Sequence, residues 1–242
     1  MAANAPRIGL LIPSSNTTME RDFHRFFGDD AHVHTDRMYL GSVTRAAEEA
    51  MLDDEVLPAA RRIATTRPDV IVFGCTSAGA IRGVGADDRM RAEIAEVTGT
   101  AVVGVTPSIR DELAGSAGVA VLTPYVDDLT AAVADSVRAF GLTVTATRSL
   151  GYEDNLEIGA LTPARIRDAA TGFDPAGAEV LFCSCTNLRA MEAIDDLERA
   201  TGLRVRSSNE VTAVRVAHVL GLRRGRTGAV RTGGPTTSTP QP

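Results

Sequence analysis

Short apolar runs recur along the whole chain, and amphipathic segments separate them. Eight of the runs have the length and composition of buried strands: IGLLI (8–12), VHTDRMYL (33–40), VIVF (70–73), AVVGV (101–105), VAVL (119–122), VTATRSL (144–150), EVLF (179–182) and LRVR (203–206). Four segments between them have helical spacing: DDEVLPAARRIATT (53–66), ADDRMRAEIAEVTG (86–99), YVDDLTAAVADSVRAFG (125–141) and LRAMEAIDDLERATG (188–202). Alternating strands and helices are typical of parallel sheets covered by helices on both faces, so we expect an α/β fold.

The two halves of the chain carry the same landmarks in the same order. Three pairs of residues match at a nearly constant spacing: Pro13 and Pro124 are 111 positions apart, and Gly41 and Gly151, like Cys75 and Cys185, are 110 apart. Each landmark lies at the end of an expected strand. A repeat of this length predicts two similar α/β halves related by a pseudo-two-fold axis, residues 1–114 and 115–222. Residues 223–242 are poor in apolar side chains and rich in Gly, Pro and Thr, which predicts a disordered tail.

The composition excludes several classes of partner. The 242 residues are 44% hydrophobic and 23% charged, and the net charge is -6, which disfavours nucleic acid because phosphate binding needs a basic surface. No apolar run approaches the roughly 20 residues that span a bilayer, and the apolar run at the N-terminus is too short for a signal peptide. We therefore expect a cytoplasmic protein with a small-molecule substrate and neither a membrane nor a nucleic acid as partner.

Missing residue types narrow the chemistry further. The chain has no lysine, so all 25 of its basic residues are arginine. Schiff-base enzymes need a lysine amine and a P-loop needs its phosphate-binding lysine, so both classes are excluded. Three cysteines argue against a disulfide framework. No histidine has metal-ligand spacing with Asp or Cys, and no glycine motif fits a dinucleotide site, so we predict neither a metal nor a cofactor.

Two of the three cysteines occupy matching settings. Cys75 follows the run VIVF and Cys185 follows EVLF, each is followed by threonine, and a helix is expected after each. Ligands of open parallel sheets bind at the carboxyl ends of the strands, and a helix N-terminus lowers the pKa of a thiol. If the halves face each other, the two thiols meet in one cleft suited to a small anion. The plain alternative is that both are small buried hydrophobes, as we expect for Cys183 within its strand.

Polar loops follow the matching strands. PSSNTTME (13–20) offers Ser14 and Asn16, and Thr17 and Glu20 have the spacing of a helix capping box. Such a loop is either simply a helix start or a cradle for a carboxylate. The corresponding loop of the second half offers Tyr125, a phenolic donor. The loop GYEDNLEIG (151–159) adds Asn155, an uncharged donor in a segment too polar for a core.

These motifs together resemble the aspartate/glutamate racemase superfamily, in which two pseudo-symmetric α/β halves each contribute a cysteine to a central cleft. Within it, IGLLIPSSNTTME, TPYVDDL and EDNLEIG look most like the branch of maleate cis-trans isomerase. The resemblance covers roughly residues 7–221. The chain departs from the racemases in having Asn187 where they carry an acidic residue or histidine, and it lacks their Asp-Ser opening. Arylmalonate decarboxylases share the scaffold but typically keep one cysteine.

The resemblance implies a cofactor-independent isomerase of maleate or a related small dicarboxylate. Cys75 would add to the double bond, the bond would rotate, and elimination would release the fumarate form, with Cys185 as proton donor or electrostatic partner. Asn16, Tyr125 and Asn155 would hold the carboxylates. The remaining candidates for substrate binding are the polar residues beside these groups, Ser14, Thr76, Ser77, Thr186 and Asn187, with backbone N–H groups after each cysteine. Relatives often form dimers or larger assemblies, so a homo-oligomer is expected.

Three other activities stay open at this point. A two-cysteine racemase or epimerase, of the aspartate, glutamate or hydantoin type, would use the same residues to exchange a proton on opposite faces of one carbon. A decarboxylase of the arylmalonate type would use the same scaffold. A binding protein that has lost turnover would retain the cleft alone.

Overall fold

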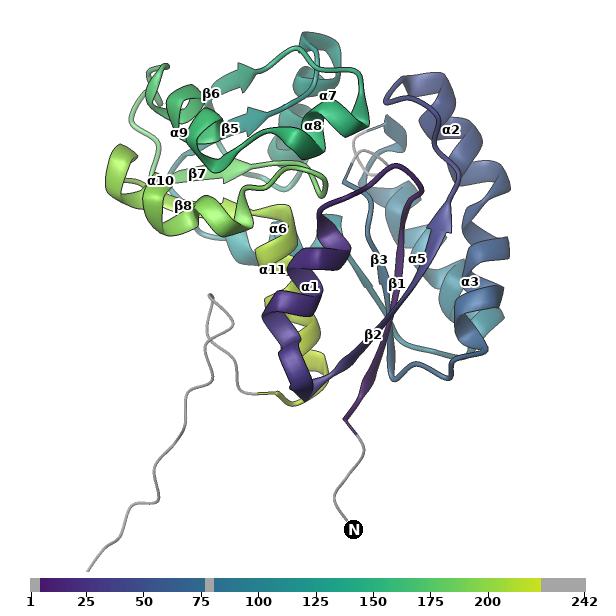
Figure 1. Cartoon of the computed structure of the whole chain (residues 1–242). Coiled ribbons are helices and arrows are strands. Elements are labelled where there is room, and N and C mark those ends of the chain that lie inside the picture. The colour runs from purple at the N-terminus through teal and green to yellow at the C-terminus, as the bar shows by residue number, and fades with distance from the viewer. Residues whose placement is uncertain (1–4, 77–80, 223–242) are drawn as a thin grey trace, which may run out of the picture.

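Two four-stranded parallel sheets form the fold, one from each half of the sequence (Figure 1). The structure is a computed structural model and describes residues 5–76 and 81–222. The strand order is β2-β1-β3-β4 in the first sheet and β6-β5-β7-β8 in the second, and every neighbouring pair is parallel. The second order repeats the first with each number raised by four. The expected α/β fold with two pseudo-symmetric halves is therefore confirmed.

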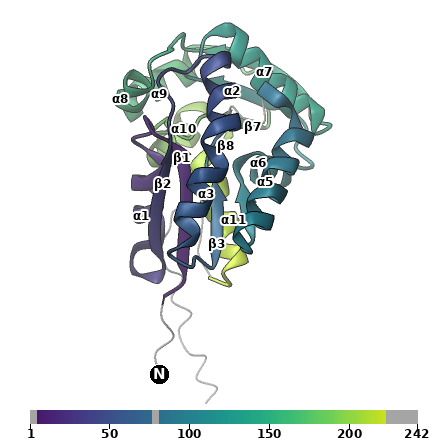
Figure 2. The same cartoon turned by 90° about the vertical axis from the view of Figure 1, so that its right-hand side faces the viewer.

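The elements of the first sheet and its surroundings come first in the chain. They are β1 (Arg7–Pro13), α1 (Met19–Phe27), the 3-10 turn η1 (Gly28–Asp30), β2 (His32–Met38), α2 (Arg45–Asp54), α3 (Val56–Ala64), β3 (Val70–Phe73), α5 (Val84–Thr98), β4 (Val102–Gly104) and α6 (Val105–Leu113). In Figure 1, α2, α3 and α5 lie on one side of this sheet, and α1 and α11 lie on the other. Figure 2, which looks from the first of these sides, shows α3 in front of the strands.

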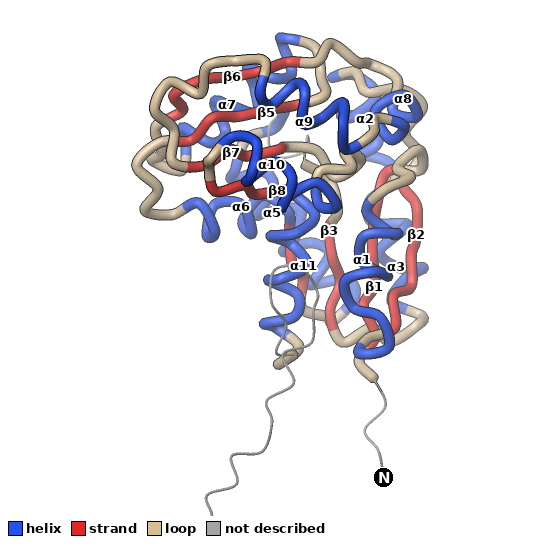
Figure 3. The backbone as a smooth tube through the Cα atoms, turned by 60° about the vertical axis from the view of Figure 1, so that its left-hand side comes forward, coloured by secondary structure: helices blue, strands red, loops and turns tan. Residues whose placement is uncertain are grey.

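The second sheet and its helices follow. They are β5 (Val119–Thr123), α7 (Asp127–Ala139), β6 (Val144–Ser149), α8 (Asn155–Ala160), α9 (Pro163–Thr171), β7 (Val180–Cys183), the 3-10 turn η2 (Met191–Ala193), α10 (Ile194–Thr201), β8 (Arg204–Ser207) and α11 (Ser208–Val219). The strands of the two sheets run in different directions, upright in the first and across the view in the second (Figure 3). Loops that follow the strands of the two sheets contact each other: Asn16, after β1, bonds to Thr186, after β7, and Val43, after β2, bonds to Glu153, after β6. We call this contact between the halves the seam, and the carboxyl ends of the strands of both sheets border it.

Strand alternation divides the side chains of β1 between two apolar clusters. Ile8, Leu10 and Ile12 belong to a large cluster that also contains core residues of the second half, whereas Leu11 belongs to a smaller cluster beneath α2, α3 and α5. All four side chains are fully buried, and burying one such side chain contributes about 1.5–3 kcal/mol. The large cluster thus joins the two halves into one hydrophobic core.

Two helices cross from one half to the other. Helix α11 follows the last strand of the second sheet, yet it packs against α1, α6, β3 and β4 of the first half. Helix α6 belongs to the first half, yet its Ile109 borders the same small space as Phe182 of β7 and Val133 of α7. In Figure 1 the yellow-green α11 lies beside the purple α1. Each half therefore supplies a helix that helps to cover its neighbour.

All eight expected strands are present, but some expected helices begin elsewhere. The helix expected from residue 53 begins at Val56, with Pro58 in its first turn where a missing N–H is harmless, and residues 45–54 form a further helix that we did not expect. The helix expected from Leu188 begins at Ile194, because the preceding residues turn tightly and Leu188 N–H bonds to Cys185 O.

The expected division at residues 114 and 115 stays a prediction, and the predicted tail, residues 223–242, lies outside the described residues. Within residues 5–76 and 81–222, no helix combines the length and apolar character that a membrane span requires.

Candidate active site

The two matching cysteines lie where the carboxyl ends of the two sheets meet. Cys75 comes two residues after the last residue of β3, and Cys185 comes two residues after the last residue of β7. Both are buried and neither is in a disulfide. The loops that carry them touch, since Thr186 Oγ1 donates to Gly74 O at 3.4 Å. The structure therefore brings the two cysteine loops together across the seam.

Tyr125 lies among the same groups. It follows β5 by two residues, is buried, and is hydrogen-bonded to Cys185. Burial raises the pKa of Tyr125 well above its ordinary value, and Cys185, Glu48 and Cys75 raise it further. The phenol therefore stays protonated at neutral pH and is available as a donor.

The environment of Cys185 differs from the sequence expectation. Burial raises the pKa of its thiol to about 11, although Tyr125 and the N–H groups of Asn187 and Leu188 lower it in part. The Asn187 N–H lies 3.2 Å from Cys185 Sγ. We expected a following helix to lower this pKa, which is wrong because turns, not a helix, follow Cys185. At neutral pH Cys185 is a protonated thiol and can donate a proton.

Asn16 organises the loop after β1. Its Oδ1 accepts the N–H groups of Thr18 and Met19, both at 3.0 Å, and so caps the start of α1. Its Nδ2 donates to Thr186 Oγ1 of the other half at 3.0 Å. One side chain thus fixes the start of a helix and the loop of the second cysteine.

The capping box expected at Thr17 and Glu20 is absent from this helix start. Thr18 occupies the N-cap position without a side-chain cap, because Asn16 already accepts the free N–H groups. Glu20 instead pairs with Arg37 of β2 at 2.6 Å. The helix start was predicted correctly and its capping group was not.

Asn187 and Asn155 form a polar bridge between the halves. Asn187 Oδ1 accepts the N–H of Thr17 at 2.8 Å, and its Nδ2 donates to Asn155 Oδ1 at 2.9 Å. Asn155 Nδ2 in turn donates to Ser15 Oγ at 2.9 Å. Asn155 is the first residue of α8, which Asp154 caps by accepting the N–H groups of Leu156 and Glu157. The network holds the loop after β6 against the loop after β1.

The other expected residues are less closely joined to this cluster. Ser14 Oγ accepts the N–H of Leu40 at 3.0 Å and so holds the loops after β1 and β2 together. Thr76 is buried and borders a small space beside Phe182 and Ser184, and its Oγ1 has no hydrogen bond within the described part of the chain. Ser77 lies outside the described residues. Cys183 is fully buried in the large core cluster, as expected.

One residue of this cluster escaped the sequence analysis. Glu48, on α2, is only 2% exposed, and the Cys75 thiol donates to its Oε2 at 3.6 Å. A signal was present: Glu48 is spaced three and four positions before Met51 and Leu52, on the face of α2 that is buried. We missed it because α2 itself was not predicted.

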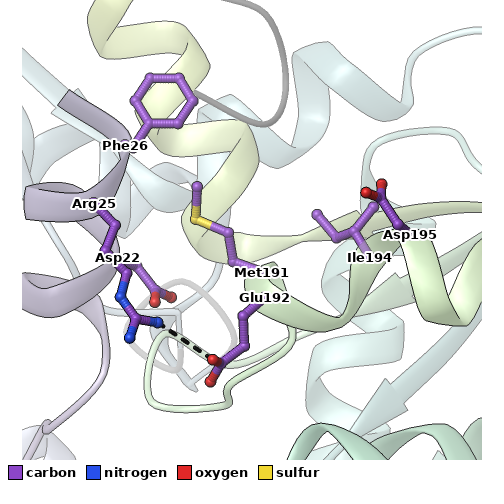
Figure 4. A pocket seen from close by; sticks show the side chains of 7 residues that line it. All are labelled: Asp22, Arg25, Phe26, Met191, Glu192, Ile194 and Asp195. Atoms are coloured by element: carbon purple, nitrogen blue, oxygen red, sulfur yellow. Dashed lines mark hydrogen bonds and ion pairs between the residues drawn. The ribbon is translucent and has the colours of Figure 1, made fainter. Parts of the chain in front are cut away.

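One cavity lies away from the cysteines. It has a volume of about 310 Å³ and lies between α1 and the η2–α10 segment, lined by Asp22, Arg25, Phe26, Met191, Glu192, Ile194 and Asp195 (Figure 4). Arg25 and Glu192 pair across it at 3.3 Å. Burial raises the pKa of Asp22 to about 6. Asn209 links the two regions, since its Nδ2 donates to Asp22 Oδ2 at 2.8 Å and to Thr186 O at 3.0 Å.

No group of three or more His, Cys, Asp or Glu side chains among residues 5–76 and 81–222 is placed to hold a metal ion. The chemistry that the described geometry offers is that of two thiols, a phenol, a buried carboxylate and several amides.

Comparisons with known proteins agree on one family. The family model described as Arylmalonate decarboxylase matches residues 8–232. A maleate isomerase of Geobacillus stearothermophilus is 29% identical over 233 residues, which are 90% of this chain and 92% of the relative. A maleate isomerase of Nocardia farcinica (strain IFM 10152) is 30% identical over 231 residues, 89% of this chain and 90% of the relative.

Solved structures agree as well. A variant of the maleate isomerase Iso from Pseudomonas putida S16, crystallised with maleate, has a TM-score of 0.87 at 25% identity and covers 92% of this chain and 95% of its own. A variant of the Nocardia farcinica maleate cis-trans isomerase, with a covalently bound succinylcysteine intermediate, has a TM-score of 0.83 at 27% identity. The match covers 90% of this chain and 93% of that structure's chain.

Proposed function

Because the chain belongs to the family whose model is described as Arylmalonate decarboxylase, and because relatives that are 29% and 30% identical to it are maleate isomerases, we propose that it is an isomerase of maleate or a related small dicarboxylate. The observation that carries the proposal is the meeting of Cys75 and Cys185 around Tyr125, one cysteine from each half. The two thiols can supply a nucleophile and a proton donor, and the protonated phenol can supply a hydrogen bond to the substrate, so the reaction would need no cofactor.

The first half of the reaction is an addition. The Cys75 thiol gives its proton to a neighbouring base, its Sγ forms a bond to one alkene carbon, and the electrons of the double bond move to the neighbouring carbon and its carboxylate. Cys185 then gives its proton to that carbon. Burial, which keeps the Cys185 thiol protonated at neutral pH, suits it to this role. The product of the step is a saturated adduct on sulfur.

The second half reverses the addition after rotation. The former double bond is now single and turns freely. The Cys185 thiolate takes a proton back from the carbon, the double bond reforms, the bond to Cys75 breaks to release the trans acid, and the Cys75 sulfur regains its proton from the base. Proton and electrons return to their starting places, so the cycle balances without an oxidant or a cofactor. Nucleophilic catalysis of this kind replaces one difficult step by two easier ones.

Neutral donors would hold the two carboxylates. We assign this role to Asn16, Tyr125 and Asn155, supported by Ser14 and by the N–H groups after each cysteine. In the structure the amide of Asn16 donates to Thr186 and that of Asn155 donates to Ser15, so each would exchange a protein partner for a substrate oxygen. Donors that stabilise the charge developing in the transition state raise the rate more than equal binding of the ground state does.

One similar solved structure fits this sequence of steps. The Nocardia farcinica variant carries a succinylcysteine, a saturated four-carbon acid bonded to a cysteine sulfur. The adduct proposed for Cys75 with maleate has the same composition.

The test is a proton NMR assay of the purified protein with maleate in deuterated buffer and no added cofactor. We expect the fumarate signal to grow, and we expect Cys75→Ala to abolish that growth while circular dichroism stays native. Cys183→Ala is the matched control, because it removes a buried thiol that faces the core, and it should retain activity. Fumarate formation by Cys75→Ala would rule out Cys75 as the nucleophile.

A two-cysteine racemase or epimerase is the second candidate, because thiols from opposite halves are also what a two-base proton exchange needs. An arylmalonate decarboxylase is less supported, since the scaffold is shared but the second cysteine is not required. Incubation with aspartate, glutamate, hydantoins and arylmalonates separates them. Deuterium uptake at the α-carbon would favour the racemase, and loss of carbon dioxide would favour the decarboxylase.

A homo-oligomer and a cytoplasmic location are proposals of the same kind. Tyr39 and Leu156 are large apolar side chains exposed by 70% and 61%, which is consistent with a contact between copies. Light scattering should give a mass of at least twice the 25.4 kDa of one chain, and cell fractionation should place the protein in the cytoplasm.

A further inference from the structure

Glu48 places a carboxylate directly against the proposed nucleophile. The side chain is 2% exposed, and its Oε2 accepts a hydrogen bond from Cys75 Sγ at 3.6 Å. The geometry is that of an S–H···O hydrogen bond, so the thiol proton already points at the carboxylate. Burial of a carboxylate is unfavourable unless hydrogen bonds or charges compensate it, and the Cys75 thiol supplies one such hydrogen bond.

The chain around Glu48 fixes its position. Thr44 caps α2 by accepting the N–H of Ala47 at 3.4 Å, and Met51 and Leu52 anchor the buried face of the helix in the smaller core cluster. The N–H of Val43, just before the helix, donates to Glu153 O of the other half at 3.3 Å. Glu48 is thus held from both halves of the molecule.

Glu48 faces the whole reacting cluster. Its charge is among the causes that raise the pKa of Tyr125 and of Cys185, so the groups titrating around it are Cys75, Cys185 and Tyr125. Each of these three is neutral when protonated. A Glu48 that kept its charge during the addition would repel the negative charge that develops on the substrate.

We propose that Glu48 is the catalytic base that takes the thiol proton of Cys75 as the sulfur attacks the substrate. The assignment rests on the proposed function. The S–H bond breaks as the C–S bond forms, the proton moves to Glu48 Oε2, and the carboxylate becomes a neutral acid. Negative charge develops on the substrate as Glu48 loses its own, so the developing charge does not face a charged Glu48. Glu48 can return the proton when the thiolate leaves.

The role gives a signature in thiol reactivity that does not depend on turnover. A thiol with its own base reacts at a constant rate over the pH range between the titration of the base and that of the thiol. A thiol without one reacts about tenfold faster for each pH unit until its own pKa. Alkylation of Cys75 by iodoacetamide, followed from pH 5 to 9 by mass spectrometry of its peptide, distinguishes the two.

Glu48→Gln is the test variant, and Glu49→Gln is the matched control because Glu49 is on the same helix and pairs with Arg45 at 3.9 Å at the surface. We expect a plateau in the native protein and in Glu49→Gln, and a tenfold rise per pH unit in Glu48→Gln. We expect kcat with maleate to fall roughly 100-fold or more in Glu48→Gln with KM changed by only a few-fold. Glu48→Asp, which keeps a carboxylate, should restore part of the plateau.

The outcomes separate this role from the proposed function. An unchanged plateau and kcat in a folded Glu48→Gln protein would overturn the assignment, and so would a native Cys75 that iodoacetamide does not modify at any pH. A plateau that Glu48→Gln abolishes in a protein without maleate turnover would support Glu48 as base and leave the substrate to be found. If Glu48→Gln does not fold, the plateau of Glu48→Asp against that of Glu49→Gln decides.

Discussion

Asn187 shows how a single side chain can join two halves of a molecule. Its carbonyl oxygen accepts from Thr17, and its amide nitrogen donates to Asn155. Aspartate at this position would lose the donor, and a shorter side chain would lose both bonds, while the buried partners would be left unsatisfied. The position was predicted to bind substrate, and that role stays a prediction. In the structure its amide atoms form hydrogen bonds that join the two halves.

Asp22 should make the stability of the protein depend on pH. Burial raises the pKa of Asp22 to about 6 in the folded protein, whereas its ordinary value, 3.8, applies in the unfolded chain. The folded state therefore binds the proton more tightly. Between these values the free energy of unfolding falls as pH rises, by at most about 3 kcal/mol. Asp22→Asn removes the charge and keeps an oxygen for Asn209, so we expect it to be more stable than the native protein at pH 8 and about equal at pH 4.

Urea unfolding at several pH values measures the difference between the two proteins, in which the other titrating groups cancel. The gap should open between pH 4 and 6 and stay constant above pH 7. A variant less stable than the native protein at pH 8 would show that the contacts of Asp22 with Asn209 and Arg21 outweigh its burial.

The residues that the sequence identified share a position that a linear pattern can reveal. Cys75, Tyr125 and Cys185 each come two residues after the end of a strand, so strand prediction alone placed them at the carboxyl ends of strands. Glu48 has no such landmark, since it sits within a helix rich in acidic residues. Its burial depends on which face of α2 meets the first sheet, and that is decided by packing rather than by spacing.

At the scale of elements, the eight strands were predictable because helices cover both faces of the sheets. Strands buried on both sides read as continuous apolar runs, as β3 and β7 do. The edge strand β6, VTATRS, is half exposed and was still found because it is rich in β-branched residues. Helix starts were less predictable, because they depend on capping groups such as Asn16 that lie outside the helix.

Gly74, between the end of β3 and Cys75, is packed too closely for any residue with a Cβ atom. A Cβ on Gly74 would lie 2.8 Å from Leu11 O, 2.8 Å from Met19 Sδ and 2.9 Å from Ile12 Cγ2. We expect Gly74→Ala to lower the free energy of unfolding by about 1–3 kcal/mol through overpacking, and to lower kcat by displacing Cys75. Urea unfolding and the maleate assay measure the two effects.

Gly85→Ala is the control for that substitution. A Cβ there meets only Arg89 Nη1 at 3.6 Å, an ordinary contact, and alanine favours a helix. Stability and activity should be unchanged or slightly improved. Equal effects of the two substitutions would show that the space around Gly74 is not what limits the position.

At the scale of the whole molecule, the two halves are alike in strand order but not independent. The large core cluster takes residues from both sheets, from Ile8 and Val72 of the first to Val121 and Val180 of the second. The repeat in the sequence predicted the likeness. It could not predict the crossing of α6 and α11, because an amphipathic helix after a strand looks the same whether it packs on its own sheet or on the neighbouring one.

The crossing predicts that the first half does not fold alone. Without α11, the apolar face of β3 and β4 and the inner side of α1 would be open to water, including Val72 and Val103, which are buried in the intact chain. A fragment of residues 1–114 should therefore give a poorly dispersed amide NMR spectrum. Each Å² of apolar surface that is left exposed lowers the free energy of unfolding by about 25 cal/mol. A domain of half the size buries less apolar surface and has a smaller free energy of unfolding to begin with.

Mixing that fragment with residues 115–242 should restore the dispersed spectrum, because the second fragment supplies α11 and receives α6 in return. Val216→Asp in the second fragment is the control, since Val216 is a fully buried residue of α11 and a charge there should prevent the two fragments from associating. A well-dispersed spectrum from residues 1–114 alone would mean that the first sheet is stable without α11. In that case the active site would need the second half only for its catalytic residues. If the fragments fold only together, through α11, then the same association that completes the fold also brings Cys75 to Cys185.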